Sequence, residues 1–353
     1  MKGIILHGGH GTRLRPLTHT GPKQLLPIAN KPMSHYCVET IIQAGISEIA
    51  FIVGGTGVEK VKEYYGNGEK FGVNFSYIYQ ESPKGIAHAI SLCKDFIKDE
   101  KFVVFLGDNI INKKIDEYLL DFQNSNAFAS LLLCEVDNPS QFGVAQIENK
   151  QIIKIVEKPK NPISNLAVTG IYFLTPYIFE IIKKIKPSWR NELEIADALQ
   201  LLIEENKKID YNIITDFWKD TGTPKDIIEA NKKILEDMEY LQKDTFDKKN
   251  NFDGKVIIDQ GTVIENSVQI TGPVIIGKNC VIEENAKILG NTSIGDNSHI
   301  SNCIISDSII MSDCVIKGNF EIKNSIIGSN SKIVKNQVND NRFLLGEGSQ
   351  LSI

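Results

Sequence analysis

Short apolar runs alternate with amphipathic stretches across residues 1–240 of the chain. The runs have the length and the Val, Ile and Phe content of buried strands, and the stretches between them have helical spacing. Strands are predicted at 3–6, 48–53, 74–79, 101–106, 126–135, 142–148, 152–157 and 166–174. Helices are predicted at 39–44, 59–65, 87–97, 176–184, 194–205 and 223–242. This alternation is typical of an α/β fold with a mostly parallel sheet.

A different rhythm begins at Ile258, where isoleucine recurs at every sixth position. A period of six fits neither a helix nor a single strand, but it is typical of a parallel β-helix built from short strands and tight turns. Asn and Gly would supply the turns, and the isoleucines would form a continuous core. The predicted inward positions are Ile258, Ile264, Ile270, Ile276, Ile282, Ile288, Ile294 and Ile300, then, after a slip, Ile304, Ile310, Ile316 and Ile322, and, after a second slip, Ile327 and Ile333.

The change of rhythm divides the chain into two domains. A polar segment rich in Lys, Asp and Asn separates the two patterns, and segments of this composition are typical linkers. We predict a first domain at 1–240, a linker at 241–253 and a β-helix at 254–345. The length of 353 residues agrees with about two domains.

Composition narrows the class of protein. Lys and Arg number 39 against 44 Asp and Glu, and the net charge of −5 offers no basic surface for a nucleic acid. No apolar run reaches the length of a membrane span, and the N-terminus lacks the pattern of a signal peptide. The six cysteines show no CxxC spacing, which favours reduced, buried thiols. We therefore expect a cytoplasmic protein that binds neither nucleic acid nor membrane.

A glycine-rich loop follows the first predicted strand. Gly8, Gly9 and Gly11 allow backbone N–H groups to approach phosphates closely, and Arg13 and Arg15 add cations that can grip phosphate oxygens. The loop lacks the Gly-Lys-Ser/Thr ending of a Walker A loop, and its GGxG spacing is not the dinucleotide fingerprint. The combination favours binding of nucleotide phosphates over a plain tight turn.

Two carboxylates are candidate ligands for a magnesium ion. Asp108 ends the strand predicted at 101–106, and ligands of open α/β sheets bind at the carboxyl ends of strands. Mg²⁺ prefers oxygen ligands and is usually shared between protein carboxylates and phosphates, and Asp220 would be the second carboxylate. Ordinary roles stay open here: Asp108 could cap a turn, and Asp220 precedes Thr223, a good helix N-cap.

Other polar segments carry less information. Gln80 offers an amide donor and acceptor that suit the edge of a pyrimidine, although an ordinary loop also explains its surroundings. Glu157 and Lys158 end a predicted strand, where a solvated charge pair is the commoner outcome. The six histidines show no spacing of metal ligands, and we expect each to have a satisfied structural or surface role.

Five segments of the chain form a recognisable series. They are Gly8-Gly9-His10-Gly11-Thr12-Arg13-Leu14, Pro22-Lys23-Gln24-Leu25-Leu26-Pro27-Ile28, Gly107-Asp108-Asn109, Glu157-Lys158-Pro159 and Trp218-Lys219-Asp220-Thr221-Gly222. In this order they resemble the sugar-1-phosphate nucleotidyltransferase family, and most of all its glucose-1-phosphate thymidylyltransferase group in the long form. The resemblance covers nearly the whole chain. It implies a Rossmann-like nucleotidyltransferase domain with a mostly parallel sheet, followed by a left-handed parallel β-helix of hexapeptide repeats.

The resemblance also implies roles for individual residues. The implied catalytic cations are Arg13, Lys23 and Lys158. The residues implied to bind the nucleotide are Leu6, Gly8, Gly9, Gly11, Thr12, Arg13, Gln24, Gln80, Pro83, Gly85 and Asp108. Those implied to bind the sugar phosphate are Asn109, Gly143, Glu157, Lys158, Val168, Thr169, Gly170 and Glu192. Asp108 and Asp220 would hold Mg²⁺. His7 stands where the family usually has Ala or Ser, so we expect its ring to crowd or reshape the nucleotide pocket.

The implied reaction transfers a thymidylyl group from dTTP to α-D-glucose 1-phosphate and gives dTDP-glucose and pyrophosphate. The sugar phosphate would attack the α-phosphorus in line, and because it is already an anion, positioning and cations rather than a general base would carry the catalysis. UTP or another sugar phosphate is the alternative substrate. An acetyltransferase in the β-helix, with His299 as its base, and a binding subunit without turnover also stay open. The uncovered faces of such a repeat further predict a homo-oligomer.

Overall fold

The computed structural model describes residues 1–9, 11–238 and 251–335 of the chain. These residues belong to two units. The first consists of Met1–Thr12, Thr18–Leu25 and Met33–Asp220, and the second of Arg13–Leu17, Leu26–Pro32 and Thr221–Ile353. Of the predicted linker, 241–250 lies outside the described residues, and so does the predicted end of the β-helix at 336–345.

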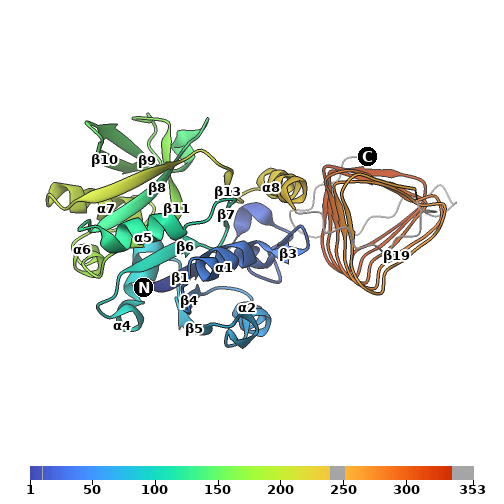
Figure 1. The fold of residues 1–353 in the computed structure, drawn as a ribbon, viewed down its shortest axis with the longest axis horizontal. Helices are drawn as coiled ribbons and strands as arrows, with labels where there is room; N and C mark the ends of the chain where they lie inside the picture. Colours follow the sequence, from blue (N-terminus) through green and yellow to red (C-terminus); the bar gives the residue numbers. More distant parts are fainter. Residues whose placement is uncertain (10, 239–250, 336–353) are drawn as a thin grey trace. The chain divides into compact units, whose positions relative to one another are not determined.

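A nine-stranded mixed sheet forms the centre of the first unit (Figure 1). Its main path runs β10 (Gln151–Glu157), β9 (Gly143–Glu148), β11 (Leu166–Leu174), β6 (Phe102–Leu106), β1 (Lys2–His7), β4 (Glu48–Val53) and β5 (Asn74–Tyr79). β8 (Ala129–Glu135) pairs with β11, and β12 (Ile209–Ile214) pairs with β8. β6, β1, β4 and β5 are parallel, so their carboxyl ends share one edge of the sheet. The predicted Rossmann-like α/β fold is confirmed, with β9, β10 and β11 adding an antiparallel part.

Helices cover both faces of this sheet. Successive residues of a strand point to opposite faces, so Ile4 lies in one apolar cluster and Ile5 in the other. The helices of the Ile4 cluster are α3 (Ile86–Ser91), α4 (Lys94–Ile97), α6 (Ile178–Ile182) and α7 (Ile195–Glu204). Those of the Ile5 cluster are α1 (Met33–Gln43), α2 (Val58–Tyr65) and α5 (Asp116–Asn124). Burial on both faces explains why the strands are continuous apolar runs.

Some elements of the structure differ from the predicted pattern. α5, β12 and the antiparallel pair β7 (Asn109–Ile111) and β13 (Trp218–Asp220) are not predicted. The helix predicted at 87–97 is interrupted at Leu92 and Cys93, which separate α3 from α4. The last predicted helix is α8 (Pro224–Asp237). Thr223 caps it as expected, because its Oγ1 accepts from the Asp226 backbone N–H at 3.3 Å.

Three five-stranded parallel sheets form the β-helix of the second unit. The first holds β14 (Asn251–Asp253), β17 (Gln269–Thr271), β20 (Lys287–Ile288), β23 (Ile304–Ser306) and β26 (Glu321–Lys323). The second holds β15 (Val256–Ile258), β18 (Val274–Ile276), β21 (Thr292–Ile294), β24 (Ile309–Ile310) and β27 (Ile326–Ile327). The third holds β16 (Val263–Ile264), β19 (Val281–Ile282), β22 (His299–Ser301), β25 (Val315–Lys317) and β28 (Lys332–Val334). In Figure 1 the coils appear as stacked triangles, which is the predicted left-handed parallel β-helix.

The isoleucine columns fill the β-helix, with one correction to the predicted register. From Ile270 to Ile300 the predicted positions are fully buried. After the slip, however, Ile305 and not Ile304 pairs with Ile288 and is fully buried. Ile304 lies beside Lys287 in the outward column. Neighbouring residues of a strand face opposite sides, so a shift of one position reverses inside and outside.

Asparagine and aspartate make most of the described β-helix corners. Their φ angles lie between 47° and 62°, in the left-handed region that short polar side chains tolerate better than other non-glycine residues. The residues are Asn279, Asn285, Asn291, Asn297, Asn302, Asp307, Asp313, Asn324 and Asn330. The richness in Asn therefore has a local cause, as the predicted turns require.

Helix α8 packs against the β-helix within the second unit. Asn231 of α8 is buried and makes three hydrogen bonds. Its Oδ1 accepts from the Ala29 backbone N–H at 2.8 Å and from Ser293 Oγ at 3.0 Å, and its Nδ2 donates to the Asn291 carbonyl at 3.0 Å. Asn231 thus joins α8, the short strand pair β2 (Pro27–Ile28) and β3 (Lys31–Pro32), and the β-helix.

Replacing Asn231 by alanine is expected to lower the free energy of unfolding of this unit by about 2–4 kcal/mol, because two buried groups and one partly buried carbonyl lose their partner. Urea unfolding followed by circular dichroism measures the change. Lys225→Gln on the same helix is the control, since the Lys225 side chain is 85% exposed and a surface change of this kind stays within about 0.5 kcal/mol. An unfolding midpoint of Asn231→Ala equal to that of the control would contradict the assignment.

Candidate active site

The glycine-rich loop leaves β1 at the carboxyl end of the parallel strands. Gly9 and Gly11 have φ angles of 98° and 58°, which favour glycine. The Gly11 carbonyl accepts from Thr18 Oγ1 at 2.8 Å and so ties the loop to the chain that follows it. Thr12 is exposed at the start of the turn η1 (Thr12–Leu14). The loop therefore keeps a backbone shape that allows a phosphate to approach, while His10 lies outside the described residues.

A largely buried ion pair stands beside this loop. Lys23, in the turn η2 (Lys23–Leu25), donates from its ammonium to Asp108 Oδ2. Asp108 follows β6 and is 9% exposed. Burial alone would raise the pKa of Asp108, but the neighbouring Lys23 charge, together with hydrogen bonds to the carboxylate, holds the pKa below its ordinary value. Asp108 is thus kept ionised where a parallel sheet binds its ligands.

The pairing of β7 with β13 brings the second predicted metal ligand next to the first. Asp220 lies opposite Asn109 in this pair. Asn109 is buried, and its Nδ2 donates to Asp108 Oδ1 at 3.1 Å while its Oδ1 accepts from Trp218 Nε1 at 2.8 Å and from the Gly170 N–H at 3.3 Å. Asn109, predicted to bind sugar, therefore also fixes its neighbours.

These two carboxylates fit a magnesium ion but do not enclose one. No cluster of three or more His, Cys, Asp or Glu side chains within the described ranges could hold a metal by itself. Mg²⁺ is commonly bound by one or two carboxylates and completed by waters and substrate phosphates. Asp108 and Asp220 supply such a partial set.

Two predicted ligand-binding side chains have buried atoms without a hydrogen-bond partner. Gln24 donates from Nε2 to the Gly8 carbonyl at 3.0 Å, but its Oε1 accepts no hydrogen bond. Thr169, on β11, is fully buried, and its Oγ1 also has no partner. Buried polar atoms of folded proteins nearly always have partners, and exceptions gather at functional sites. One orphaned atom is thus on the predicted nucleotide side and one on the predicted sugar side.

His7 does not have the satisfied role expected from the sequence. Its ring is buried, and neither Nδ1 nor Nε2 has a hydrogen-bond partner. It packs edge-on against the rings of Phe51 and Tyr65, with centroids 5.2 and 6.0 Å away. Burial lowers the pKa of His7 to about 3, although the charge of Asp108 acts in the opposite direction. The ring is therefore a neutral part of the core at physiological pH.

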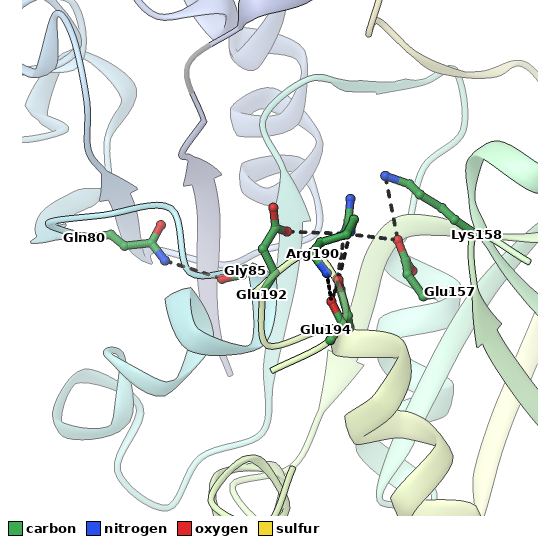
Figure 2. A network of polar contacts seen from close by, with 8 residues as sticks. Gln80, Gly85, Glu157, Lys158, Arg190, Glu192 and Glu194 are labelled. Atoms are coloured by element: carbon green, nitrogen blue, oxygen red, sulfur yellow. Dashed lines mark hydrogen bonds and ion pairs between the residues drawn. The ribbon is translucent and has the colours of Figure 1, made fainter. Parts of the chain in front are cut away.

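The loop predicted to read the base is held in one conformation. Gln80 is buried after β5, and its Nε2 lies 3.4 Å from the Gly85 carbonyl (Figure 2). The same Nε2 lies 2.9 Å from His88 Nδ1. Gly85 has φ 98° and ψ 167°, and a Cβ on it would lie 2.4 Å from the Leu193 carbonyl oxygen. Only glycine fits this position, where the loop touches a distant segment.

Three further predicted nucleotide-binding residues have surroundings of their own. The Leu6 side chain belongs to the apolar core, and its carbonyl accepts from the Gly107 N–H at 3.0 Å. Pro83 is exposed. Arg13 belongs to the second unit, where its guanidinium lies against Gly222.

Three predicted sugar-binding residues, Gly143, Glu157 and Lys158, lie where the start of β9 pairs with the end of β10. Glu157 ends β10, and Gly143 faces it so closely that a Cβ there would lie 3.2 Å from Glu157 Oε2. Lys158 has a φ of 42°, which is uncommon for a residue with a side chain. Its Nζ lies 3.8 Å from Glu157 Oε1. Such strained conformations are concentrated at functional sites.

The ladder between β11 and β8 is irregular near these residues. The pairing of β11 with β8 shifts register between Val168 and Tyr172, so that Thr169 and Gly170 have no partner in β8. Bulges of this kind re-aim side chains and are frequent beside active sites. The predicted residues Val168, Thr169 and Gly170 thus stand at the break in the ladder.

One arginine that is not among the predicted site residues organises the acidic side chains here. Arg190 donates from Nε and Nη2 to the Glu194 carboxylate at 3.0 and 2.8 Å, and its Nη2 also lies 3.2 Å from Glu192 and 3.6 Å from Glu157 (Figure 2). Glu192 is therefore placed by Arg190. The i,i+4 spacing of Arg190 and Glu194 before α7 is the one local signal that points to this contact.

His299 is the histidine of the repeat. It lies on β22, with its Nε2 2.5 Å from Glu283 Oε2, and Lys317 Nζ lies 3.5 Å from the same oxygen. Its side chain is about one-third exposed. It takes part in a cluster of polar side chains on the outside of one sheet.

Known families account for both halves of the chain. The family model described as nucleotidyl transferase matches residues 2–237. The chain belongs to the nucleotidyl transferase family. A second family model, described as the GMPPB C-terminal domain, matches residues 270–352 of this nucleotidyl transferase.

Several curated proteins and solved structures are similar to this nucleotidyl transferase. The low-salt glycan biosynthesis nucleotidyltransferase Agl11 of Haloferax volcanii is 44% identical over 72% of each chain. A glucose-1-phosphate thymidylyltransferase of Streptomyces antibioticus is 43% identical over 76% of this chain and 75% of its own. The UTP–glucose-1-phosphate uridylyltransferase AglF of Haloferax volcanii is 36% identical over 67% of this chain and 98% of its own. The predicted resemblance to thymidylyltransferases is confirmed.

A solved structure is also similar to this nucleotidyl transferase. A Bacillus anthracis protein assigned as glucose-1-phosphate thymidylyltransferase, in complex with sucrose, is 42% identical with a TM-score of 0.64. The match covers 68% of this chain and 97% of that protein. Among the described residues, no helix combines the length and hydrophobicity of a membrane span.

Proposed function

We propose that this nucleotidyl transferase transfers a thymidylyl group from dTTP to α-D-glucose 1-phosphate and releases pyrophosphate. The observation that carries the proposal is the largely buried pair of Lys23 and Asp108 at the carboxyl end of β6, together with the orphaned buried atoms of Gln24 and Thr169. The pair suits a phosphate and a metal ion, and the orphaned atoms suit polar groups of two ligands. The thymidylyltransferase relatives support the choice of substrates.

The residues suit a reaction that needs cations rather than a base. The phosphate oxygen of the sugar attacks the α-phosphorus in line, the bond to the β-phosphate oxygen breaks, and pyrophosphate leaves with the electron pair. The obstacle is repulsion between two polyanions, so fixed positive charge lowers the barrier. Arg13 is proposed to act on the leaving phosphates, Lys23 on the α-phosphate and Lys158 on the sugar phosphate.

A divalent metal belongs to this proposal. Asp108 and Asp220 would hold Mg²⁺ together with phosphate oxygens. When bound, the ion would neutralise triphosphate charge and help to orient the nucleotide. Asp108 is already ionised beside Lys23, and Asn109 orients it by a hydrogen bond.

The base is proposed to bind at the loop from Gln80 to Gly85. Thymine and uracil differ by one methyl group, which is worth only about 1–3 kcal/mol of discrimination in an apolar pocket. We therefore expect dTTP to be preferred over UTP by about 10- to 200-fold in kcat/KM and not absolutely. The uridylyltransferase relative makes this comparison the decisive one.

A matrix of nucleotides and sugar phosphates tests the proposed function. Pyrophosphate release is measured for dTTP, UTP, dCTP, dATP and dGTP, each with the 1-phosphates of glucose, galactose, mannose and N-acetylglucosamine. We expect the highest kcat/KM for dTTP with glucose 1-phosphate. A higher kcat/KM for UTP than for dTTP would show that the proposed nucleotide is wrong. A higher kcat/KM for another sugar phosphate would show that the proposed acceptor is wrong. If no pair released pyrophosphate, the proposed activity itself would be refuted.

The pH dependence of kcat/KM should show the titration of the Glu157 carboxylate. Burial raises its pKa, and Glu194 and Asp197 act in the same direction, while Lys158 and Arg190 oppose them. Since the ionised carboxylate accepts hydrogen bonds from sugar hydroxyls, kcat/KM for glucose 1-phosphate should fall as the pH drops through this raised pKa. The fall should therefore occur at a pH above the ordinary glutamate pKa of 4.5.

Glu157→Gln cannot titrate at this position, so this acidic fall should be absent from its profile. Its kcat/KM at neutral pH is expected to be about 10- to 100-fold lower, the effect of losing a hydrogen bond to a charged group. Titration of the substrate phosphate is common to both proteins, so the difference between the profiles isolates Glu157. Superimposable profiles would show that Glu157 does not bind the sugar.

A further inference from the structure

Two buried hydroxyl groups connect helices α1 and α2 to the turn that carries Lys23. Ser34, the second residue of α1, is fully buried, and Tyr65, the last residue of α2, is 1% exposed. The Ser34 hydroxyl donates to the Gln24 carbonyl at 3.0 Å, and its oxygen lies 2.7 Å from the Tyr65 hydroxyl oxygen. The two helices and the turn η2 are therefore joined at one serine side chain.

The direction of these hydrogen bonds follows from the number of hydroxyl protons. A serine hydroxyl has one proton, and Ser34 uses it for the Gln24 carbonyl. Tyr65 then has to donate to Ser34 Oγ. Burial raises the pKa of Tyr65 well above its ordinary value, so its hydroxyl keeps the proton that this bond requires. The series of donors thus runs from Tyr65 through Ser34 to Gln24.

The ring of Tyr65 is fixed by its neighbours. It stacks on the Phe51 ring, with centroids 4.6 Å apart, and meets the Phe75 ring edge-on at 5.9 Å. The His7 ring packs against it at 6.0 Å, directly before the glycine-rich loop. A ring that is close-packed on several sides cannot turn its hydroxyl toward another acceptor. Tyr65 is thus a fixed donor in the core of the first unit.

Gln24 connects these hydroxyls to the candidate active site. Ser34 holds its backbone carbonyl, while its side chain donates from Nε2 to the Gly8 carbonyl at 3.0 Å. Lys23 precedes Gln24 in the same turn and contacts Asp108. A shift of the Gln24 peptide would therefore move the Lys23 ammonium as well.

We propose that Ser34 is a positioning residue, oriented by Tyr65, that fixes Lys23 for the triphosphate by holding the Gln24 carbonyl. The inference rests on the proposed function, because it assigns a support to the same site. Ser34 does not touch the substrate in this role. A hydroxyl suits the task, since one small group accepts from Tyr65 and donates to Gln24 at once, which alanine cannot do.

Ser34→Ala is expected to lower kcat by about 10- to 100-fold, the loss that follows a small displacement of a positioned catalytic group. KM for glucose 1-phosphate should change by less than about threefold, because Glu157 at the end of β10 belongs to a different segment. Tyr65→Phe should cost less than about threefold in kcat, since Ser34 still donates to Gln24. Pyrophosphate release with dTTP and glucose 1-phosphate measures each value.

Ser298→Ala is the matched control. Ser298 is 1% exposed and bridges two groups of the β-helix, donating to the Met311 carbonyl at 3.2 Å and accepting from the Cys314 N–H at 3.3 Å. Its replacement also removes a buried hydroxyl, so the melting temperature should fall, but kcat should stay within about twofold of wild type. A kcat of Ser34→Ala equal to that of this control would overturn the inference.

Two double variants separate positioning from stability. Adding Tyr65→Phe to Ser34→Ala removes a buried hydroxyl that has lost its partner, so the melting temperature should rise again while kcat stays low. In a Lys23→Met background, Ser34→Ala should lower kcat by less than about a further twofold, because the group that Ser34 positions is already absent. A merely structural serine would instead lower kcat by the same factor with and without Lys23.

The outcomes distinguish the inference from the proposed function. Equal losses with and without Lys23 would refute the positioning role of Ser34 and leave the proposed function intact. Recovery of kcat together with the melting temperature in the variant that combines Ser34→Ala and Tyr65→Phe would do the same. If wild type releases pyrophosphate with no pair of substrates, the proposed function is refuted, and the inference with it.

Discussion

Replacing Lys23 by methionine is expected to lower kcat by about 100- to 1,000-fold, the loss that follows removal of one preorganised charge-stabilising group. Methionine keeps an apolar stem but carries no charge. The Lys23 ammonium contacts the buried Asp108 carboxylate, so its removal also leaves a negative charge uncompensated. We therefore expect a lower melting temperature as well. Steady-state kinetics with saturating dTTP and glucose 1-phosphate measure the first effect, and thermal unfolding measures the second.

A double variant separates these two effects. In Lys23→Met with Asp108→Asn the buried charge is absent, so the melting temperature should recover while the activity should not. Lys62→Met is the matched control, because Lys62 forms an exposed pair with Glu59 at 3.2 Å. It should keep activity within about twofold. A Lys23→Met protein as active as this control would show that Lys23 is not a catalytic cation.

Replacing Gly85 by alanine is expected to raise KM for dTTP by at least about 100-fold. The φ and ψ angles of 98° and 167° lie in a region that is essentially restricted to glycine, at a cost of about 1–3 kcal/mol for other residues. The new Cβ would also lie 2.4 Å from the Leu193 carbonyl oxygen and 2.7 Å from its nitrogen, both of which are backbone atoms. The turn has to move, and the base loses its pocket.

Two measurements give this prediction its specificity. Inhibition by pyrophosphate should change by less than about threefold, because the phosphate loop is a separate segment of the chain. Gly72→Ala is the control: its φ is 70°, and no atom lies within 4 Å of the added Cβ. It should cost about 1 kcal/mol of stability and leave KM for dTTP unchanged. Equal effects of both substitutions on KM would mean that the contact with Leu193 has no part in base binding.

Local patterns account for much of the fold. β4, β5 and β11 begin and end where the apolar runs predict them. β12 is not predicted because its residues before Ile214 are partly buried or exposed and include Asp210 and Asn212, so it forms no apolar run. The misplaced inward position after Ile300 has another cause. Ile304 and Ile305 are the same residue type, and only the length of the turn before them decides which one faces the core.

For the candidate site too, local sequence patterns predict some features, and other features depend on contacts between distant parts of the chain. Lys23 and Asp108 can be selected from their own segments, but their contact joins positions 85 residues apart. The position of Asp220 depends on the pairing of β13 with β7, and no local sequence pattern predicts this pairing. The contacts of Arg190 are not predicted from the sequence, because the fold brings the three carboxylates around its guanidinium. Sequence therefore identifies the chemical groups more readily than the groups that orient them.

The way in which Asn231 is bonded limits how genes of this type can recombine. A single crossover within 239–250 would keep the native Ala29 and Asn231 but replace Asn291 and Ser293 with residues of a foreign repeat. The hybrid would inherit a buried amide whose partners had evolved elsewhere. A viable exchange has to transfer Leu26–Pro32, α8 and the repeat together. We therefore expect that the β-helix is not exchanged between proteins as a separate domain. Its ancestry should follow that of Leu26–Pro32, the seven-residue segment near the start of the chain.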